Sequence, residues 1–115
     1  MNIHHMSLQN QYFCLIKQGK KSIELRLWDD KRKKIKVGDI IVFHNVDSAE
    51  TILETKVVQL YFAADFQELS KITNIKQTGF NDTATMLQTL EKIYPLSQQK
   101  KYQVVGIEIQ LMKKT

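Results

Sequence analysis

Residues 22–27 alternate strictly between polar and apolar side chains, which is the pattern of a half-buried β-strand. The apolar side chains are Ile23, Leu25 and Leu27, and the polar ones are Ser22, Glu24 and Arg26. We expect the apolar face to pack on a hydrophobic core. On the other face Glu24 and Arg26 lie two residues apart, about 7 Å along a strand, so each charge remains available to hold part of a ligand.

Glycine, lysines and a tryptophan flank this strand. Gly19 is expected to end the preceding helix, because glycine tolerates the left-handed backbone conformation found there. The chain then delivers Lys20 and Lys21 to the head of the strand, and Trp28 follows its end. Residues 31–36 add five cations in six positions. Cationic side chains neutralise phosphate and an aromatic ring stacks on a base, so this segment suits a nucleotide or single-stranded RNA.

The rest of the chain predicts an α+β fold of about five to six strands with two to three flanking helices. Helices are expected at residues 10–19, with Asn10 as the cap, at residues 65–69, and from Asn81 or Asp82 to Pro95. Further strands are expected at residues 4–8, 40–43, 51–60 and 102–112, the second and third of these forming a hairpin. No repeat or linker divides the sequence, so we expect residues 1–115 to form a single domain closed as a small mixed β-barrel.

Composition narrows the class of protein. The 115 residues include 17 Lys and Arg against 12 Asp and Glu, a net charge of +5, which favours polyanionic partners. Cys14 is the single cysteine, so no internal disulfide is expected, and a reducing cytoplasm fits best. No stretch approaches the ~20 apolar residues that a membrane crossing needs, and residues 1–6 do not resemble a signal peptide. We expect a cytoplasmic monomer without a membrane partner.

Three kinds of chemistry have no support in the sequence. His4, His5 and His44 lack companion cysteines and an HExxH spacing, so no metal site is expected. The isolated glycines form neither a P-loop nor a dinucleotide fingerprint, and no cofactor is expected. Ser22 follows two lysines instead of lying in a GxSxG turn, which argues against a serine nucleophile.

The candidate ligand-binding residues therefore cluster around residues 22–27. They are Lys20, Lys21, Glu24, Arg26, Trp28, Arg32 and Lys36. An arginine grips phosphate through two parallel hydrogen bonds, and a carboxylate accepts a hydrogen bond from an exocyclic amine. In a purely structural interpretation, Glu24 pairs with Arg26 or Lys21 on a solvated strand and Trp28 plugs the barrel. If the protein is an enzyme, Lys21 and Glu24 are the candidate catalytic residues.

These residues resemble the ASCH domain family, in its short single-domain bacterial type. The resemblance covers nearly the whole chain and rests on the signature G-x-K-x-x-E-x-R at residues 19–26, on residues 36–43 and on the closing residues 102–109. It implies the PUA-like fold, a small mixed β-barrel with flanking helices. It also implies a cleft beside the signature that binds RNA or a modified nucleoside, with Lys21, Glu24 and Arg26 at the matching positions.

One bacterial branch of this family hydrolyses N4-acetylcytidine. It uses a lysine at the position of Lys21, a threonine where this chain has Glu24, and a glutamate ahead of the late helix. This chain matches only the lysine, because residues 78–83 offer Asp82 but no glutamate. Other members are linked to RNA cleavage, for which Lys21 and Glu24 would serve as acid and base on a 2′-hydroxyl.

Three functions follow from these observations. The first is the binding of RNA, a nucleotide or a modified nucleoside in a basic cleft around the signature. The alternative is a small hydrolase that acts on a modified nucleoside such as N4-acetylcytidine, or a ribonuclease. The third is an interaction module whose basic loop at residues 31–36 binds an acidic partner.

Overall fold

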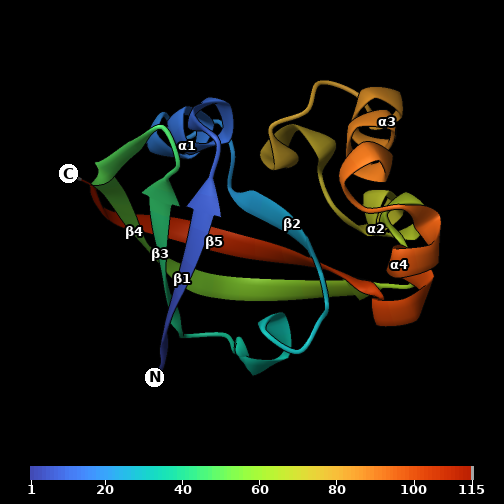
Figure 1. Ribbon diagram of the computed structural model, residues 1–115, viewed down its shortest axis with the longest axis horizontal. Helices are drawn as coiled ribbons and strands as arrows, with labels where there is room; N and C mark the ends of the chain where they lie inside the picture. Colours follow the sequence, from blue (N-terminus) through green and yellow to red (C-terminus); the bar gives the residue numbers. More distant parts are fainter. Residues whose placement is uncertain (115) are drawn as a thin grey trace.

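A curved, five-stranded sheet forms the body of the fold (Figure 1). The computed structural model describes residues 1–114, with side chains at all of them except residues 49, 113 and 114. The strands are β1 (Ile3–Leu8), β2 (Ile23–Leu27), β3 (Ile40–Asn45), β4 (Ser48–Ala63) and β5 (Val104–Lys114). They lie in the order β1-β3-β4-β5-β2, with β1 and β3 parallel and every other neighbouring pair antiparallel. The first two strands of the chain are therefore the two edges of the sheet.

These two edges approach each other because the sheet curls. Arg26 of β2 donates a hydrogen bond from Nη2 to the Ser7 carbonyl of β1 at 3.1 Å. The carbonyls of Asn2 and Leu8 accept from the β3 side, so the backbone groups of Ser7 point away from β3 and toward β2. The predicted small mixed barrel is thus confirmed, in the form of a half-barrel with a seam between β1 and β2.

The helices occupy the connections between strands. In residues 1–114, α1 (Asn10–Lys17) follows β1, while α2 (Phe66–Ile72), α3 (Thr83–Ile93) and α4 (Leu96–Tyr102) lie between β4 and β5. Two 3₁₀ turns, η1 (Arg32–Lys34) and η2 (Ile75–Thr78), follow β2 and α2. Figure 1 shows α2, α3 and α4 together at one end of the sheet, with α1 nearer the other end.

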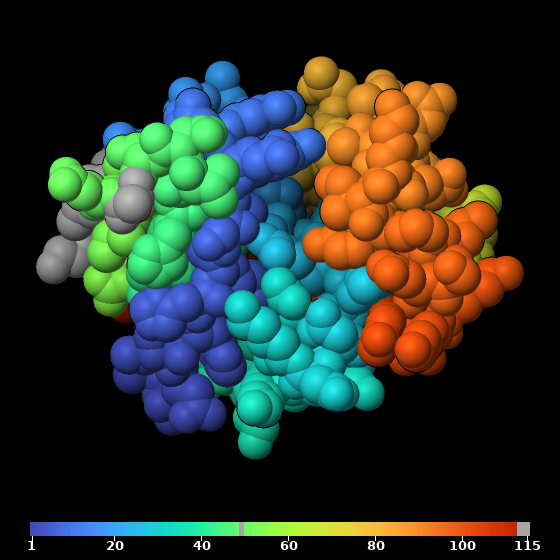
Figure 2. Space-filling view, viewed as in Figure 1, coloured from blue at the N-terminus to red at the C-terminus, as the bar shows by residue number. Residues whose placement is uncertain are grey.

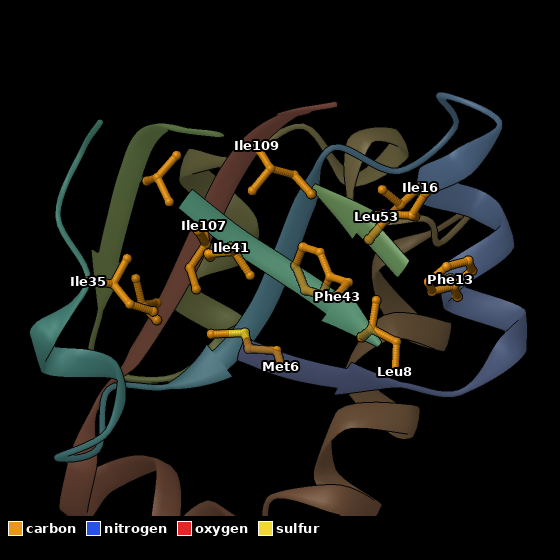
Figure 3. Packing of buried hydrophobic residues seen from close by; sticks show 12 residues of the cluster. Met6, Leu8, Phe13, Ile16, Ile35, Ile41, Phe43, Leu53, Ile107 and Ile109 are labelled. Atoms are coloured by element: carbon orange, nitrogen blue, oxygen red, sulfur yellow. The ribbon is translucent and has the colours of Figure 1, made fainter. Parts of the chain in front are cut away.

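Strand β2 separates two hydrophobic cores. The core inside the half-barrel includes Phe13, Phe43 and Ile107 (Figure 3). The core between the sheet and the helices contains Ile23, Leu25, Leu27, Phe66, Leu69, Met86, Leu90 and Val104. The predicted apolar face of β2 is thus confirmed, because all three of its apolar side chains pack in this second core. The alternate side chains of β2 must then point into the half-barrel.

The α+β class and the number of strands are confirmed, but the predicted number of helices was too low. Helix α4 escaped detection because its buried side chain is the polar Gln99 rather than an apolar residue. Gln99 accepts a hydrogen bond from the Phe66 amide at 3.0 Å and donates one to the Tyr94 carbonyl at 2.8 Å. A helix whose buried side chain is polar shows no hydrophobic periodicity in the sequence, so the sequence pattern does not predict it.

One predicted helix cap is confirmed and another is wrong. Asp82 caps α3 and accepts a hydrogen bond from the Thr85 amide at 2.7 Å. At α1 the capping position belongs to Gln9, and Asn10 instead accepts from the Asn45 side chain at 2.8 Å. The predicted hairpin is present, although its turn is shorter than expected and β4 begins at residue 48 instead of 51.

Asp39 ties the start of β1 to the turn before β3. Its carboxylate accepts hydrogen bonds from the His4 ring at 2.8 Å and from the amides of Lys36 at 3.0 Å and Asn2 at 3.1 Å. The bond from His4 contributes most, and together with those from the two amides it outweighs burial and lowers the pKa of Asp39 to about 2 from the ordinary 3.8. Asp39 is therefore ionised in the folded protein at neutral pH.

We predict that Asp39→Asn lowers the free energy of unfolding at neutral pH by about 1–3 kcal/mol, because a charged acceptor is lost. The folded pKa lies below the ordinary value, so this contribution is present above about pH 4 and is lost as the pH falls toward 2. Urea denaturation across this range measures the difference, with the exposed Asp30→Asn as control. A difference between wild type and Asp39→Asn that does not change with pH would contradict the account.

Candidate functional site

The polar face of β2 is turned into the molecule. Glu24 and Arg26 lie opposite Ile107 and Val105 of β5, which both belong to the core inside the half-barrel. Glu24 is only 5% exposed, and Lys21, just before the strand, is 4% exposed. The two charges of β2 do not stay apart as expected, because Arg26 Nε donates to Glu24 Oε2 at 2.8 Å.

The ammonium group of Lys21 is surrounded by three acceptors. Nζ donates to the carbonyls of Thr78 at 2.9 Å and Ile23 at 3.1 Å, and it lies 3.2 Å from Glu24 Oε1. These acceptors match the three N–H bonds of an ammonium group. The Ile23 carbonyl faces the seam, because the neighbouring Ser22 carbonyl already accepts from β5. Lys21 therefore satisfies a backbone group that no neighbouring strand pairs.

Gly79 makes room for the stem of Lys21. Its φ of +87° lies in the left-handed region, which glycine adopts without steric cost. A Cβ atom at this position would lie 3.3 Å from Lys21 Cδ and 3.2 Å from Leu15 Cδ1. Backbone conformation and close packing both favour glycine here. The connection from η2 to α3 therefore packs directly against the Lys21 side chain.

Glu24 is the centre of the network. Oε1 also accepts from the Leu25 amide at 3.3 Å, and Oε2 lies 2.8 Å from Arg26 Nη2 as well as accepting from Nε. Burial alone raises the pKa of the Glu24 carboxyl, but the charges of Lys21 and Arg26 and their hydrogen bonds outweigh it, so the pKa lies below its ordinary value. One buried carboxylate thus compensates a buried lysine and a partly buried arginine.

Arg26 extends the network across the seam. Besides its contacts with Glu24, its guanidinium donates a hydrogen bond to the Ser7 carbonyl of β1. Burial lowers the pKa of Arg26, and the charge of Glu24 followed by the Tyr94 side chain raises it above its ordinary value. The arginine therefore joins the two edges of the sheet.

A cavity of about 170 Å³ lies over this network at the seam. It is lined by Ser7, Leu8, Gln9, Tyr12, Lys21, Glu24, Leu25, Arg26, Phe80, Leu90, Ile93 and Tyr94. The rings of Tyr12 and Phe80 have centroids 6.2 Å apart, and Lys21 Nζ lies 5.7 Å from the centroid of the Tyr12 ring. Figure 2 shows the hollow between the blue N-terminal segments and the orange α3. The seam cavity therefore has a charged floor and aromatic walls.

Of the seven predicted ligand-binding residues, Lys21, Glu24 and Arg26 line the seam cavity and the other four do not. Trp28 packs edge-to-face on Phe62, with ring centroids 4.8 Å apart, and against the core inside the half-barrel. The predicted stacking role of Trp28 is therefore not available at this cavity. Its placement agrees with the structural interpretation in which Trp28 plugs the barrel.

The remaining predicted residues belong to the surface around the basic loop and the end of α1. Lys20 and Lys36 are exposed. Arg32 pairs with Asp29, Nη1 lying 3.1 Å from Oδ2, and its own side chain is 17% exposed. None of these three side chains lines the seam cavity.

Sequence reasoning missed the three aromatic side chains of the cavity. Tyr12 comes from α1, Phe80 from the segment before α3, and Tyr94 from the residue after α3. No linear motif links positions so far apart in the sequence. The sequence around Tyr12 indicates only that this residue lies on the apolar side of a helix. The only local sequence feature that could have indicated these cavity residues is that Phe80 precedes α3 and Tyr94 follows it.

Two searches for other kinds of site gave no result. Among the residues that the structure describes, no group of three or more His, Cys, Asp or Glu side chains is placed to hold a metal ion. No helix within residues 1–114 is both long and apolar enough to cross a membrane.

Comparison with known proteins identifies the family. Residues 6–113 match the model of the ASCH domain. The chain belongs to the ASCH domain family. Hypothetical protein PH0355, known from a crystal structure, is 36% identical with a TM-score of 0.84, over 97% of this chain and 100% of that one. Protein PF0455 from Pyrococcus furiosus, known from a solution NMR structure, is 32% identical with a TM-score of 0.75, over 96% and 98% of the two chains.

A more distant ASCH structure has the same fold. The S128A mutant of ZmASCH from Zymomonas mobilis has a TM-score of 0.64 at 11% identity, over 98% of this chain and 72% of that one. The PUA-like half-barrel is confirmed by this likeness. The bacterial type stays a prediction, because PF0455 comes from an archaeon. A comparison with curated proteins gave no match.

We predict that Glu24→Gln lowers the free energy of unfolding by about 3–5 kcal/mol, because it leaves the buried Lys21 and the partly buried Arg26 without their counter-charge. Glu68→Gln is the matched control, since the Glu68–Lys71 pair is 55% and 62% exposed and should contribute less than about 1 kcal/mol. Urea denaturation measures both.

The effect of Glu24→Gln should also depend on pH. The folded pKa of Glu24 lies below the ordinary 4.5, so its stabilising contribution is present above that value and is lost as the pH falls through the folded pKa. Equal, small losses for Glu24→Gln and Glu68→Gln would show that the buried network is not what stabilises the seam.

Proposed function

We propose that this ASCH protein binds an unstacked nucleoside unit in the seam cavity, either within RNA or as a free modified nucleoside. The ASCH family is associated with RNA binding. The observation that supports the proposal best is the convergence of three aromatic side chains over a buried, charged floor. Aromatic rings stack on any base, and a base can enter a cavity between side chains only after it has left its own stack.

Glu24 would organise the floor rather than contact the ligand. Its two oxygens already face four donors, from Lys21, Arg26 and the Leu25 amide, which uses the lone-pair sites of a carboxylate. The polar groups left for a ligand are the hydroxyl of Tyr12 and the backbone along the seam. This differs from the sequence-based interpretation, in which the carboxylate accepted a hydrogen bond from an exocyclic amine.

The contacts of Lys21 and Glu24 favour binding over hydrolysis. A general acid or base must exchange a proton with the substrate, and a side chain whose donors or acceptors are all used must first give up protein contacts. Lys21 has three acceptors within 3.2 Å, and two of them are backbone carbonyls. The glutamate at residue 24 also departs from the threonine of the hydrolase branch of the family.

The basic surface outside the cavity would attract the phosphates of the ligand. Lys20, Arg32 and Lys36 lie beyond the cavity lining and suit long-range attraction better than contact with a base. The net charge of +5 acts in the same direction. In this proposal the chain acts as a single domain and a cytoplasmic monomer, without a metal or cofactor.

Chemical-shift perturbation tests the proposal. The isotope-labelled protein is titrated with the four common ribonucleosides, N4-acetylcytidine and short single-stranded RNAs. We expect shifts at Tyr12, Phe80 and Tyr94, and we expect Phe80→Ala to weaken binding about 5- to 100-fold, the range for one base–aromatic stack. Phe62→Ala, at a half-exposed aromatic outside the cavity, is the control and should leave affinity unchanged.

Two results would overturn this proposal. Shifts confined to the basic loop at residues 31–36, with Phe80→Ala without effect, would favour an interaction module. Chromatography of the N4-acetylcytidine sample gives the other test, because we expect no product. Product that disappears in Lys21→Met, with the fold intact, would establish a hydrolase.

A further inference from the structure

A second cavity, of about 260 Å³, lies next to the first along β1. It is lined by His4, His5, Met6, Asp30, Lys31, Lys34 and Ile35. We infer that this second cavity binds the phosphate group attached to the nucleoside in the seam cavity. The inference rests on the proposed function, and none of these lining residues belongs to the seven predicted ligand-binding residues.

The 3₁₀ geometry of η1 explains why two particular lysines share this cavity. A 3₁₀ helix has three residues per turn, so side chains three positions apart lie on the same side. Lys31 and Lys34 are three apart and both line the cavity. Ile35 at the end of η1 is buried in the core inside the half-barrel, which fixes the orientation of the turn. Lys33, on another side of the same turn, does not line the cavity.

The charge of the lining suits an anion. The lining itself holds two lysines and one carboxylate, that of Asp30, while the carboxylate of Asp39 lies behind the wall and is paired with His4. Ammonium groups act as point charges on phosphate and need no bidentate geometry. A neutral or cationic ligand would gain nothing from this arrangement.

The two histidines of the wall are held by neighbouring side chains. The ionised carboxylate of Asp39 accepts from His4 Nε2 at 2.8 Å. His5 Nδ1 lies 2.9 Å from His44 Nε2, so one ring donates to the other. Side chains that are fixed before binding lose little conformational entropy when a ligand arrives. The β1 side of the cavity is therefore a preformed wall.

The two cavities are close enough for one nucleotide. Ser7 lines the first and His5 the second, two residues or about 7 Å apart along β1. Figure 2 shows the dark blue start of the chain and the cyan basic loop meeting on the same face as the seam hollow. A base in the seam cavity would thus place its own ribose phosphate toward Lys31 and Lys34.

Calorimetric titration of the whole protein compares nucleosides with nucleotides. The probes are adenosine, cytidine, guanosine and uridine, their 5′- and 3′-monophosphates, and RNA hexamers of mixed sequence. We expect at least one phosphorylated probe to bind about tenfold more tightly than its nucleoside, the gain of one charge-assisted interaction. A gain seen with monophosphates indicates a free nucleotide, and one seen only with hexamers indicates a phosphate within a strand.

Matched variants show which residues cause the gain in affinity from the phosphate group. Lys34→Ala should reduce the phosphate gain at least about threefold, and Lys31→Ala/Lys34→Ala should abolish it while nucleoside affinity is unchanged. Lys33→Ala removes the same charge one residue away, outside the cavity, and should keep most of the gain. Asp30→Asn should increase it, because the opposing carboxylate is removed. All four positions are at the surface, where substitution leaves the fold intact.

The outcomes separate the inference from the proposal on which it rests. Nucleosides that bind with no gain from phosphate would overturn the second site and leave the proposed function standing. Equal losses in Lys33→Ala and Lys34→Ala would also overturn it, because they would indicate diffuse attraction rather than a site. Failure of every nucleoside, nucleotide and hexamer to bind would overturn both.

Discussion

The structure depends on the Glu24 carboxylate, which compensates the buried ammonium group of Lys21 and the partly buried guanidinium group of Arg26. An isolated charge in a protein interior costs several kcal/mol or more, so neither Lys21 nor Arg26 is tolerable where it lies without an opposing charge and a full set of acceptors. Glu24 lies within 3.2 Å of each cation, and backbone carbonyls accept further hydrogen bonds from Lys21 Nζ and Arg26 Nη2. The charges and hydrogen bonds of the two cations also keep the Glu24 carboxylate ionised, because they lower its pKa.

This network replaces the strand pairing that the half-barrel lacks. Strands β1 and β2 do not pair, yet Arg26 bonds the Ser7 carbonyl and Lys21 bonds the Ile23 carbonyl, so side chains satisfy backbone groups along the seam. Because side chains are longer than a ladder hydrogen bond, the two edges stay far enough apart to leave a cavity between them. The Lys21–Glu24–Arg26 network thus both connects the two edges of the sheet and forms the floor of the candidate site.

The sequence was sufficient to predict the site's charged floor but not its geometry. Lys21, Glu24 and Arg26 stood out from strand alternation and spacing, which are local properties. Their mutual pairing was not predictable, because the polar face of β2 is buried only by the curl of a sheet whose edges are β1 and β2. The packing of Trp28 was not predictable for the same reason, since its partner Phe62 lies on β4. The folded chain brings together the three aromatic side chains of the cavity, Tyr12, Phe80 and Tyr94, which lie far apart in the sequence.

The most direct test of this account is a crystal structure of the protein with a bound single-stranded RNA hexamer. We predict one base in the seam cavity against Tyr12, Phe80 or Tyr94, with the Lys21–Glu24–Arg26 contacts unchanged beneath it and the adjoining phosphate beside Lys31 and Lys34. An RNA bound over the basic loop alone, with the seam cavity holding only water, would contradict the claim that the buried network supports a nucleoside site.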